Sequence, residues 1–322
     1  MSKPILAGYD PRTADRAPVD WAVAASRFTG APLIVASVQS GPAEGVAAFA
    51  EALRHSVGQV DEDLVRDCSQ IVEDIEAQLR SEGIAVECRK LQSTSAARAL
   101  HEAAAKEDAG LLVVGSSRRS SPGRLLLGST AERLMHGAPC PVAAVPQGWT
   151  ASGGPSTIGV AYINSEEGRE ALQGAHALAR RAGATLKVFT VVKVTPEMHL
   201  DTEPSLPGQG QVGTDVQDVE GRHRVEAEKE LRRVVSALGD DVPVEVDALV
   251  GDPAEVFVDV SDSLDLLVCG SRGYGPVRAV LLGSVSARVT AEAYCPVIVL
   301  PRGVKASLEA LVAEAPGAAT PA

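Results

Sequence analysis

The chain has 322 residues, of which 45% are hydrophobic and 22% are charged, and its formal net charge is −12. This length predicts two domains of ordinary size, and the composition is typical of a globular protein. The acidic balance and the absence of a lysine- and arginine-rich run argue against a nucleic-acid-binding surface, and no apolar run approaches membrane-spanning length.

Cysteine usage and the start of the chain predict the compartment. The five cysteines, Cys68, Cys88, Cys140, Cys269 and Cys295, are odd in number and contain no CxxC pair. We interpret them as reduced thiols rather than disulfides or metal ligands. The opening MSKPILAGYD enters a strand without the apolar region of a signal peptide. We therefore expect a cytoplasmic protein.

In the first half, short apolar runs alternate with segments of helical spacing. The predicted strands are residues 5–9, 33–38, 84–91, 111–114 and 142–145. The predicted helices are residues 14–28, 95–106 and a helix from Ser129. Residues 41–83, rich in Ala, Glu and Asp, predict one long or broken helix in which Gly58 would be the interruption.

The second half repeats this order. The predicted strands are residues 158–162, 186–192, 244–250, 264–269 and 297–300. The predicted helices are residues 165–181, with Ser165 as N-cap, 222–238, 253–260 and a helix opened by Gly283 and Ser284. The polar, Pro- and Gly-rich residues 193–220 predict a mobile loop, and residues 306–314 predict a short amphipathic helix.

We therefore predict two domains of one α/β architecture, at residues 1–147 and 157–303. The Gly-, Ser- and Pro-containing residues 148–156 would be the linker and residues 304–322 a tail. Alternating strands and helices predict a five-stranded parallel sheet in each domain, doubly wound with helices on both faces. Such folds bind ligands at the carboxyl ends of their strands.

An internal repeat supports this division. Four landmarks of residues 110–146 recur in residues 264–301 at a constant separation of 155 residues, as in 283 minus 128. They are Gly115 and Gly270, Gly128 and Gly283, Cys140 and Cys295, and Pro146 and Pro301. A constant separation indicates tandem duplication. In each copy a Gly-rich loop leads into a helix N-terminus, which is an arrangement suited to anions.

Together these features resemble the universal stress protein family in its tandem two-domain form, over about residues 1–147 and 157–303. Nucleotide-binding members carry G-x2-G-x9-G-S/T after the fourth strand, which Gly270, Gly273, Gly283 and Ser284 match in full. The segment VGDPAE at 250–255 and the fifth-strand segment CPVIVLP at 295–301 also resemble the family. The resemblance implies an adenine-nucleotide alpha-hydrolase-like fold and ATP, with Mg²⁺, as ligand.

The resemblance implies two sets of nucleotide-binding residues. In the first half they are Asp10, Val38, Gly115, Arg118, Gly128, Ser129 and Thr130. In the second half they are Val191, Gly270, Arg272, Gly273, Gly283, Ser284, Val285 and Ser286. Ser129 and Ser284 could also act as helix N-caps. We identify no catalytic residue and no metal-ligand spacing.

Neither half carries the complete pattern. Ile163 stands where the family's first-strand Asp is expected, and Arg118 replaces the second glycine of the first-half loop. A loop glycine is hard to replace, because a side chain intrudes on the phosphate path, although Arg118 could offer a charged contact instead. Losing the Asp removes one or two hydrogen bonds, of order 1–3 kcal/mol. The second half is therefore the favoured site.

The sequence leaves three functional interpretations open. The first is a stress-response or regulatory protein that binds ATP in at least one half. The second is a nucleotide-free interaction module that associates through its fifth strands, residues 142–145 and 297–300, within the chain or as a homodimer. The third is a slow ATPase, against which stands the lack of an evident general base or Walker-type lysine.

Overall fold

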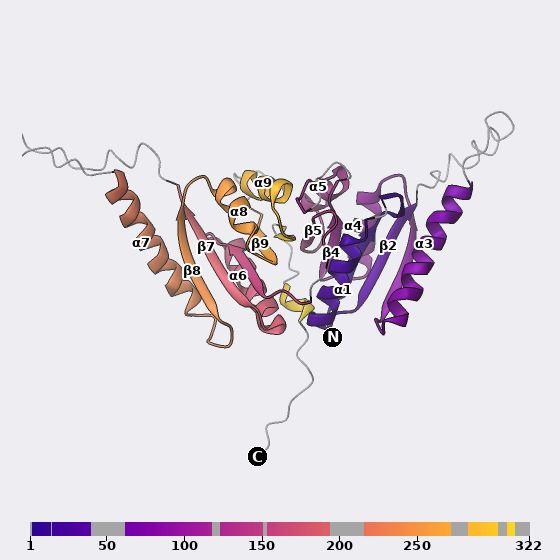
Figure 1. Ribbon diagram of the computed structural model, residues 1–322, viewed down its shortest axis with the longest axis horizontal. Coiled ribbons are helices and arrows are strands. Elements are labelled where there is room, and N and C mark those ends of the chain that lie inside the picture. Colours follow the sequence, from indigo (N-terminus) through magenta and orange to yellow (C-terminus); the bar gives the residue numbers. More distant parts are fainter. Residues whose placement is uncertain are drawn as a thin grey trace, which may run out of the picture.

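Ten strands form one continuous sheet (Figure 1) in the order β3-β2-β1-β4-β5-β10-β9-β6-β7-β8. The computed structural model describes residues 2–13, 15–39, 62–117, 123–150, 153–193, 216–271, 283–301 and 308–312. The strands are β1 (Ile5–Tyr9), β2 (Leu33–Gln39), β3 (Val86–Gln92), β4 (Leu111–Gly115), β5 (Val142–Val145), β6 (Thr157–Ala161), β7 (Thr185–Val192), β8 (Val244–Val250), β9 (Leu266–Gly270) and β10 (Val297–Leu300).

Each half contributes five parallel strands, and the two halves meet at an antiparallel seam between β5 and β10. In the register of this seam, Ala143 lies opposite Ile298 and Val142 lies opposite Val299. All residues of both strands are buried, which explains why each reads as an unbroken apolar run. Of the two fifth-strand pairings that the sequence left open, the structure therefore contains the one within the chain.

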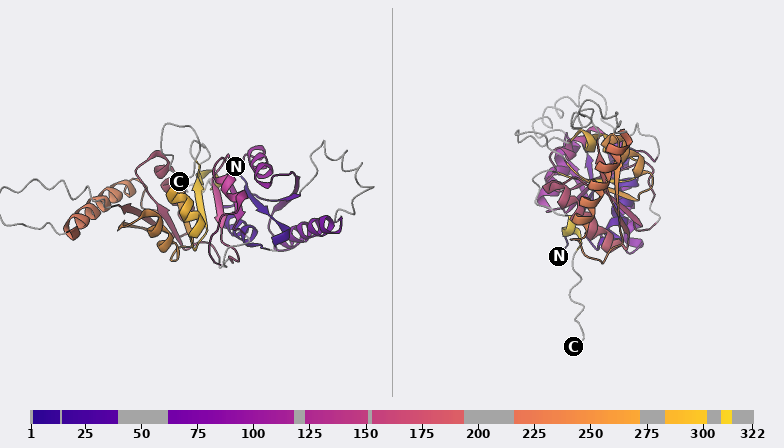
Figure 2. Two further views of the ribbon diagram at one scale, coloured as in Figure 1. Left: turned by 90° about the horizontal axis from the view of Figure 1, so that it is seen from above. Right: turned by 90° about the vertical axis from the view of Figure 1, so that its left-hand side faces the viewer.

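Helices cover both faces of the sheet, as the sequence predicts. On one face the core includes side chains of α1 (Ala17–Thr29), α3 (Glu62–Ser81), α6 (Glu166–Ala182) and α7 (Val216–Val235). On the other face it includes side chains of α4 (Ala96–Lys106), α5 (Ser129–Met135), α8 (Pro253–Ser261) and α9 (Ser284–Glu292). The two halves lie next to each other along the long axis of the molecule, with α3 and α7 at opposite outer ends (Figures 1 and 2).

The helix boundaries follow local chemistry. The Ser165 hydroxyl accepts a hydrogen bond from the backbone N–H of Gly168 at 3.0 Å, which confirms the predicted N-cap of α6. Gly183 ends α6 in the left-handed conformation, with a φ of 67°. Asp252 caps α8, since its carboxylate accepts from the N–H groups of Ala254 and Glu255.

One predicted loop is partly helical in the structure. Helix α7 begins at Val216, so the end of the predicted loop 193–220 is helical, because Val216–Val235 continues the helical spacing upstream of Arg222. The described residues of the interdomain linker are mostly exposed, whereas Trp149 is half-buried and packs against the core. Residues 40–61, with Gly58, and residues 194–215 lie outside the described part of the chain.

Near the C-terminus, a 3-10 helix, η3 (Leu308–Leu311), occupies part of the predicted helix 306–314 and contacts both halves. Leu308 packs over Gly174 of α6, where a β-carbon on the glycine would lie 2.8 Å from Leu308 Cβ. Leu311 packs over Gly110, before β4, at a corresponding 2.8 Å. The Lys3 N–H also donates to the Ala310 carbonyl at 2.9 Å. This segment, here called the C-terminal strap, joins the second half to the first.

Candidate functional site

The first half contains a cavity of about 300 Å³ at the carboxyl ends of its strands. Six of the seven binding residues predicted there line this first-half cavity. They are Asp10, Val38, Gly115, Gly128, Ser129 and Thr130. Asp10 follows β1, Val38 lies on β2, and the last three residues open α5. The fold therefore gathers residues from distant parts of the sequence, whereas Arg118 lies outside the described residues.

The structure adds polar residues to the first-half cavity that the sequence analysis missed. Thr13 and Asp15 line it from the turn between β1 and α1, and Ser116 and Ser117 line it after β4. The Thr13 hydroxyl donates to the Asp10 carbonyl at 2.8 Å, which folds this turn back on itself. These four added residues follow closely after β1 or β4. That position could have identified them in the sequence, because parallel strands place the residues after their carboxyl ends at one edge of the sheet.

Glycines, rather than the serines that follow them, occupy the N-cap positions of α5 and α9. Gly128 has extended backbone angles, with φ −85° and ψ 163°, and Gly283 has φ −63° and ψ 153°. Neither cap position makes a side-chain hydrogen bond to the helix. The interpretation of Ser129 and Ser284 as N-caps is therefore wrong, because each is the first helical residue.

The second half contains a smaller cavity, of about 100 Å³, at the equivalent place. Four of the predicted residues line this second-half cavity, namely Val191, Gly270, Val285 and Ser286. Gly283 and Ser284 are described but are not among its lining residues. Arg272 and Gly273 lie outside the described part of the chain.

Ile163 lines the second-half cavity at the position where Asp10 lines the first-half cavity. Asp10 comes directly after Tyr9, the last residue of β1, and Ile163 comes directly after Tyr162, the residue that follows β6. The Ser165 N–H donates to the Ile163 carbonyl at 2.8 Å, which draws the loop onto the first turn of α6. A β-carbon on Gly168 would lie 2.0 Å from that carbonyl oxygen. Gly168 is therefore required by the close approach of the loop.

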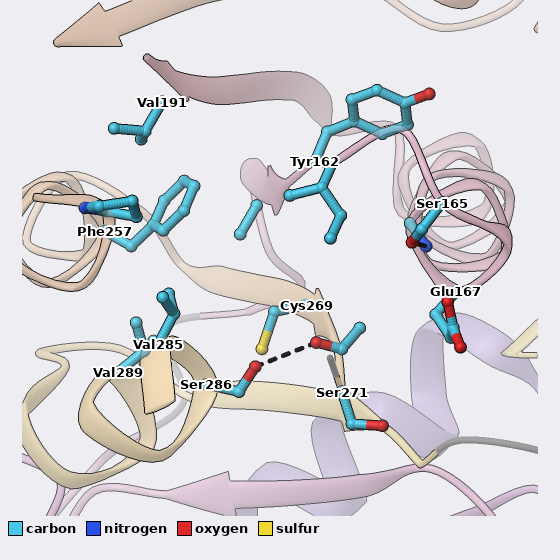
Figure 3. A pocket seen from close by; sticks show the side chains of 15 residues that line it. Tyr162, Ser165, Glu167, Val191, Phe257, Cys269, Ser271, Val285, Ser286 and Val289 are labelled. Atoms are coloured by element: carbon cyan, nitrogen blue, oxygen red, sulfur yellow. Dashed lines mark hydrogen bonds between the residues drawn. The ribbon is translucent and has the colours of Figure 1, made fainter. Parts of the chain in front are cut away.

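The remaining walls of the second-half cavity are mostly apolar (Figure 3). Phe257, Val285 and Val289 lie on one side, and Ser165 and Glu167 lie on the other. Burial raises the pKa of the Cys269 thiol to about 12, so this cysteine is neutral at physiological pH. Phe257 and Glu167 were not predicted, because neither lies in a segment that carries the resemblance to the family.

Among the residues that the structure describes, no three or more His, Cys, Asp or Glu side chains are grouped so that they could hold a metal ion. None of the helices in this described part combines the length and apolar character needed to cross a membrane.

Comparison with known proteins gives a consistent match over both halves. The model of the universal stress protein family matches residues 1–146 and again residues 155–301. A universal stress protein of Mycolicibacterium smegmatis is 28% identical over 309 residues, which cover 92% of this chain and 96% of the relative. One from Thermus aquaticus is 33% identical over 148 residues, covering 45% of this chain and 97% of that relative.

The fold also matches a solved structure. The crystal structure of a universal stress protein from Archaeoglobus fulgidus aligns over 94% of this chain and 97% of its own length, with a TM-score of 0.64 and 19% identity. This likeness supports the tandem α/β architecture.

Proposed function

Because this chain belongs to the universal stress protein family, we propose that it binds an adenine nucleotide, ATP or a related compound, in the first-half cavity. The observation that carries the proposal is the meeting of Asp10 with the hydroxyl-bearing Ser129 and Thr130 around one cavity. These residues lie near opposite ends of the first domain's sequence, and their side chains can make hydrogen bonds to a nucleotide.

The donor and acceptor groups suit the parts of a nucleotide. A carboxylate such as Asp10 accepts hydrogen bonds from ribose hydroxyls or an adenine amino group. The hydroxyls of Ser129 and Thr130 can donate to phosphate oxygens. Val38 and Leu100 offer apolar surface to a base. Asp10 and Asp15 are carboxylates of the kind that hold Mg²⁺ together with phosphates.

Cavity size favours the first half as the nucleotide site. Small-molecule sites occupy about 300–1,000 Å³, and the first-half cavity, at about 300 Å³, reaches this range. The second-half cavity, at about 100 Å³, falls below it. The glycine spacing of the second half favours a nucleotide there, but Ile163 offers no side-chain acceptor. The proposal therefore places the primary site in the first half.

The test is calorimetric titration of the full chain with ATP and Mg²⁺. Asp10→Asn keeps the side chain's size but removes its charge, and we expect it to weaken binding by about 10-fold, corresponding to roughly 1.4 kcal/mol. The matched pair Gly128→Asp and Gly283→Asp places a carboxylate at the start of α5 or α9. We expect Gly128→Asp to abolish binding and Gly283→Asp to leave it unchanged.

Two outcomes would overturn the proposal. Loss of binding in Gly283→Asp but not in Gly128→Asp would place the nucleotide in the second half. No heat at millimolar ATP would leave the alternative of a nucleotide-free interaction module. Phosphate release measured in the same samples separates a regulatory ligand from the substrate of a slow ATPase.

We also propose that the protein works in the cytoplasm as a stress-response regulator whose conformation or partner choice depends on the nucleotide. The four cysteines with described surroundings, Cys88, Cys140, Cys269 and Cys295, are all unpaired. Free thiols support a reducing compartment. Fractionation of cells followed by immunodetection tests this placement, and recovery outside the cytoplasm would contradict it.

A further inference from the structure

The two cavities differ in polarity at equivalent positions. Where the first-half cavity has Asp10, the second-half cavity has Ile163, and where the first has Thr130, the second has Val285. The second pair is separated by the same 155 residues as the repeat landmarks, as in 285 minus 130. At these two positions the second-half cavity therefore has aliphatic side chains where the first-half cavity has a carboxylate and a hydroxyl.

Of the hydroxyl groups that remain, those of Ser286 and Ser165 make hydrogen bonds within the protein, whereas the buried hydroxyls of Tyr162 and Ser271 have no hydrogen-bond partner among the described residues. The Ser286 hydroxyl donates to the Gly270 carbonyl at 3.0 Å (Figure 3). The Ser165 hydroxyl accepts from the Gly168 N–H as the cap of α6. Glu167 is the single charged side chain among the described residues that line this cavity, and its acidic group disfavours an anionic ligand.

The apolar walls come from four different elements, and three of their five residues are fully buried while Val191 and Val285 are half-buried. Val191 lies on β7, Phe257 on α8, Cys269 on β9, and Val285 and Val289 on α9. Phe257 is 3% exposed and Val289 is 1% exposed, so both are held by core packing. A phenyl ring faced by branched aliphatic side chains suits a flat apolar molecule, since aromatic rings pack favourably edge to face or offset.

The size of the cavity limits its occupant. An apolar cavity of about 150 Å³ in another protein stays dry and accepts benzene. At about 100 Å³, the second-half cavity is of the same order as that one-ring cavity and lies below the range of about 300–1,000 Å³ that larger ligands such as nucleotides occupy. We propose that the second-half cavity binds a small uncharged aromatic molecule of about one ring, rather than a nucleotide.

The test uses the full-length protein and fluorobenzene, observed by fluorine NMR. We expect the fluorobenzene line to broaden with added protein and to shift with a single saturable site. Val285→Phe fills the cavity and should weaken binding at least 10-fold. Thr130→Phe makes the matched change in the first-half cavity and should leave fluorobenzene binding unchanged.

A second variant keeps the test decisive if Val285→Phe fails to fold. Ile163→Asp restores the carboxylate of the first half to the second-half cavity, and it should also weaken fluorobenzene binding. Equal binding by wild type and both second-half variants would overturn the proposal. Displacement of fluorobenzene by ATP in the Gly128→Asp variant would overturn it as well, because it would show a nucleotide in this cavity.

This outcome is separable from that of the nucleotide proposal. Failure of ATP to bind the first half leaves the fluorobenzene result unaffected, and failure of fluorobenzene to bind leaves the ATP titration unaffected. Each cavity is thus tested by its own probe and its own variants.

Discussion

Gly115 at the end of β4 lies directly against the ring of Pro18 in the first turn of α1. A β-carbon on Gly115 would stand 2.9 Å from Pro18 Cγ. In the second half, a β-carbon on Gly270 would stand 3.1 Å from the Glu167 carbonyl oxygen, in the first turn of α6. The first glycine of each loop motif therefore allows a helix to approach the end of a strand, in addition to lining a cavity.

Substitution at these glycines should reduce stability. We expect Gly115→Ala to lower the free energy of unfolding by about 1–3 kcal/mol, because the added methyl group overpacks the contact with α1. Urea denaturation measures the change. Gly137→Ala is the control, since Gly137 has no heavy atom within 4 Å of an added β-carbon, and it should leave stability within about 0.5 kcal/mol. Equal stability of Gly115→Ala and wild type would contradict the packing role.

The C-terminal strap should contribute to the stability of both halves. Leu308 is fully buried, so Leu308→Ala should cost about 2–5 kcal/mol through lost burial and a residual cavity. The same substitution at Leu126, which is 38% exposed, should cost less than about 1 kcal/mol. Thermal unfolding followed by circular dichroism compares the two. A Leu308→Ala variant as stable as Leu126→Ala would show that the strap is dispensable.

Buried thiols should make stability fall in alkaline solution. Burial raises the pKa of Cys140 from 9.0 to about 12. Above pH 9 the unfolded chain therefore loses this proton while the folded chain retains it, so stability decreases as pH rises towards 12. Between pH 9.5 and 11, Cys140→Ala should show a shallower decrease, by about 1.4 kcal/mol per pH unit. Parallel slopes for the variant and the wild type in urea titrations would refute this.

The seam should hold the halves together without the covalent linker. Besides β5 and β10, the Leu125 N–H donates to the Ala293 carbonyl at 2.8 Å, and Arg124 pairs with Glu292 at 3.3 Å. We expect a chain with a protease site inserted in residues 148–156 to elute as one species after cleavage. Gel filtration in native buffer measures this, and 6 M urea should separate the fragments. Separate elution in native buffer would mean that the seam alone is insufficient.

Much of the fold could be predicted from periodicity, because buried parallel strands read as short apolar runs. Strand β8 is predicted to the residue at 244–250, and β5 and β10 agree as closely. Strand β9 is displaced by two residues at its start, since Leu264 belongs to the same apolar run but packs under Gly159. Burial pattern alone does not distinguish a strand residue from an adjacent core residue.

The candidate site was less predictable. Motif spacing located Gly128 and Gly270, but it could not give cavity size, which depends on side chains such as Phe257 from a different element. It could not choose between pairing of the fifth strands within the chain and between chains, since both use the same apolar surface. The contact of Leu308 with Gly174 was also invisible, because it joins residues far apart in sequence.

The antiparallel seam between β5 and β10 has a consequence for how the molecule can vary. Two separate copies of a domain that met through this strand would have identical sides, and any substitution would appear on both. With the partner tethered in the same polypeptide, its local concentration is set by the linker rather than by expression level. The two halves can therefore differ in sequence independently of each other. Every molecule carries one copy of each cavity, so the ratio of the two cavities does not depend on protein abundance.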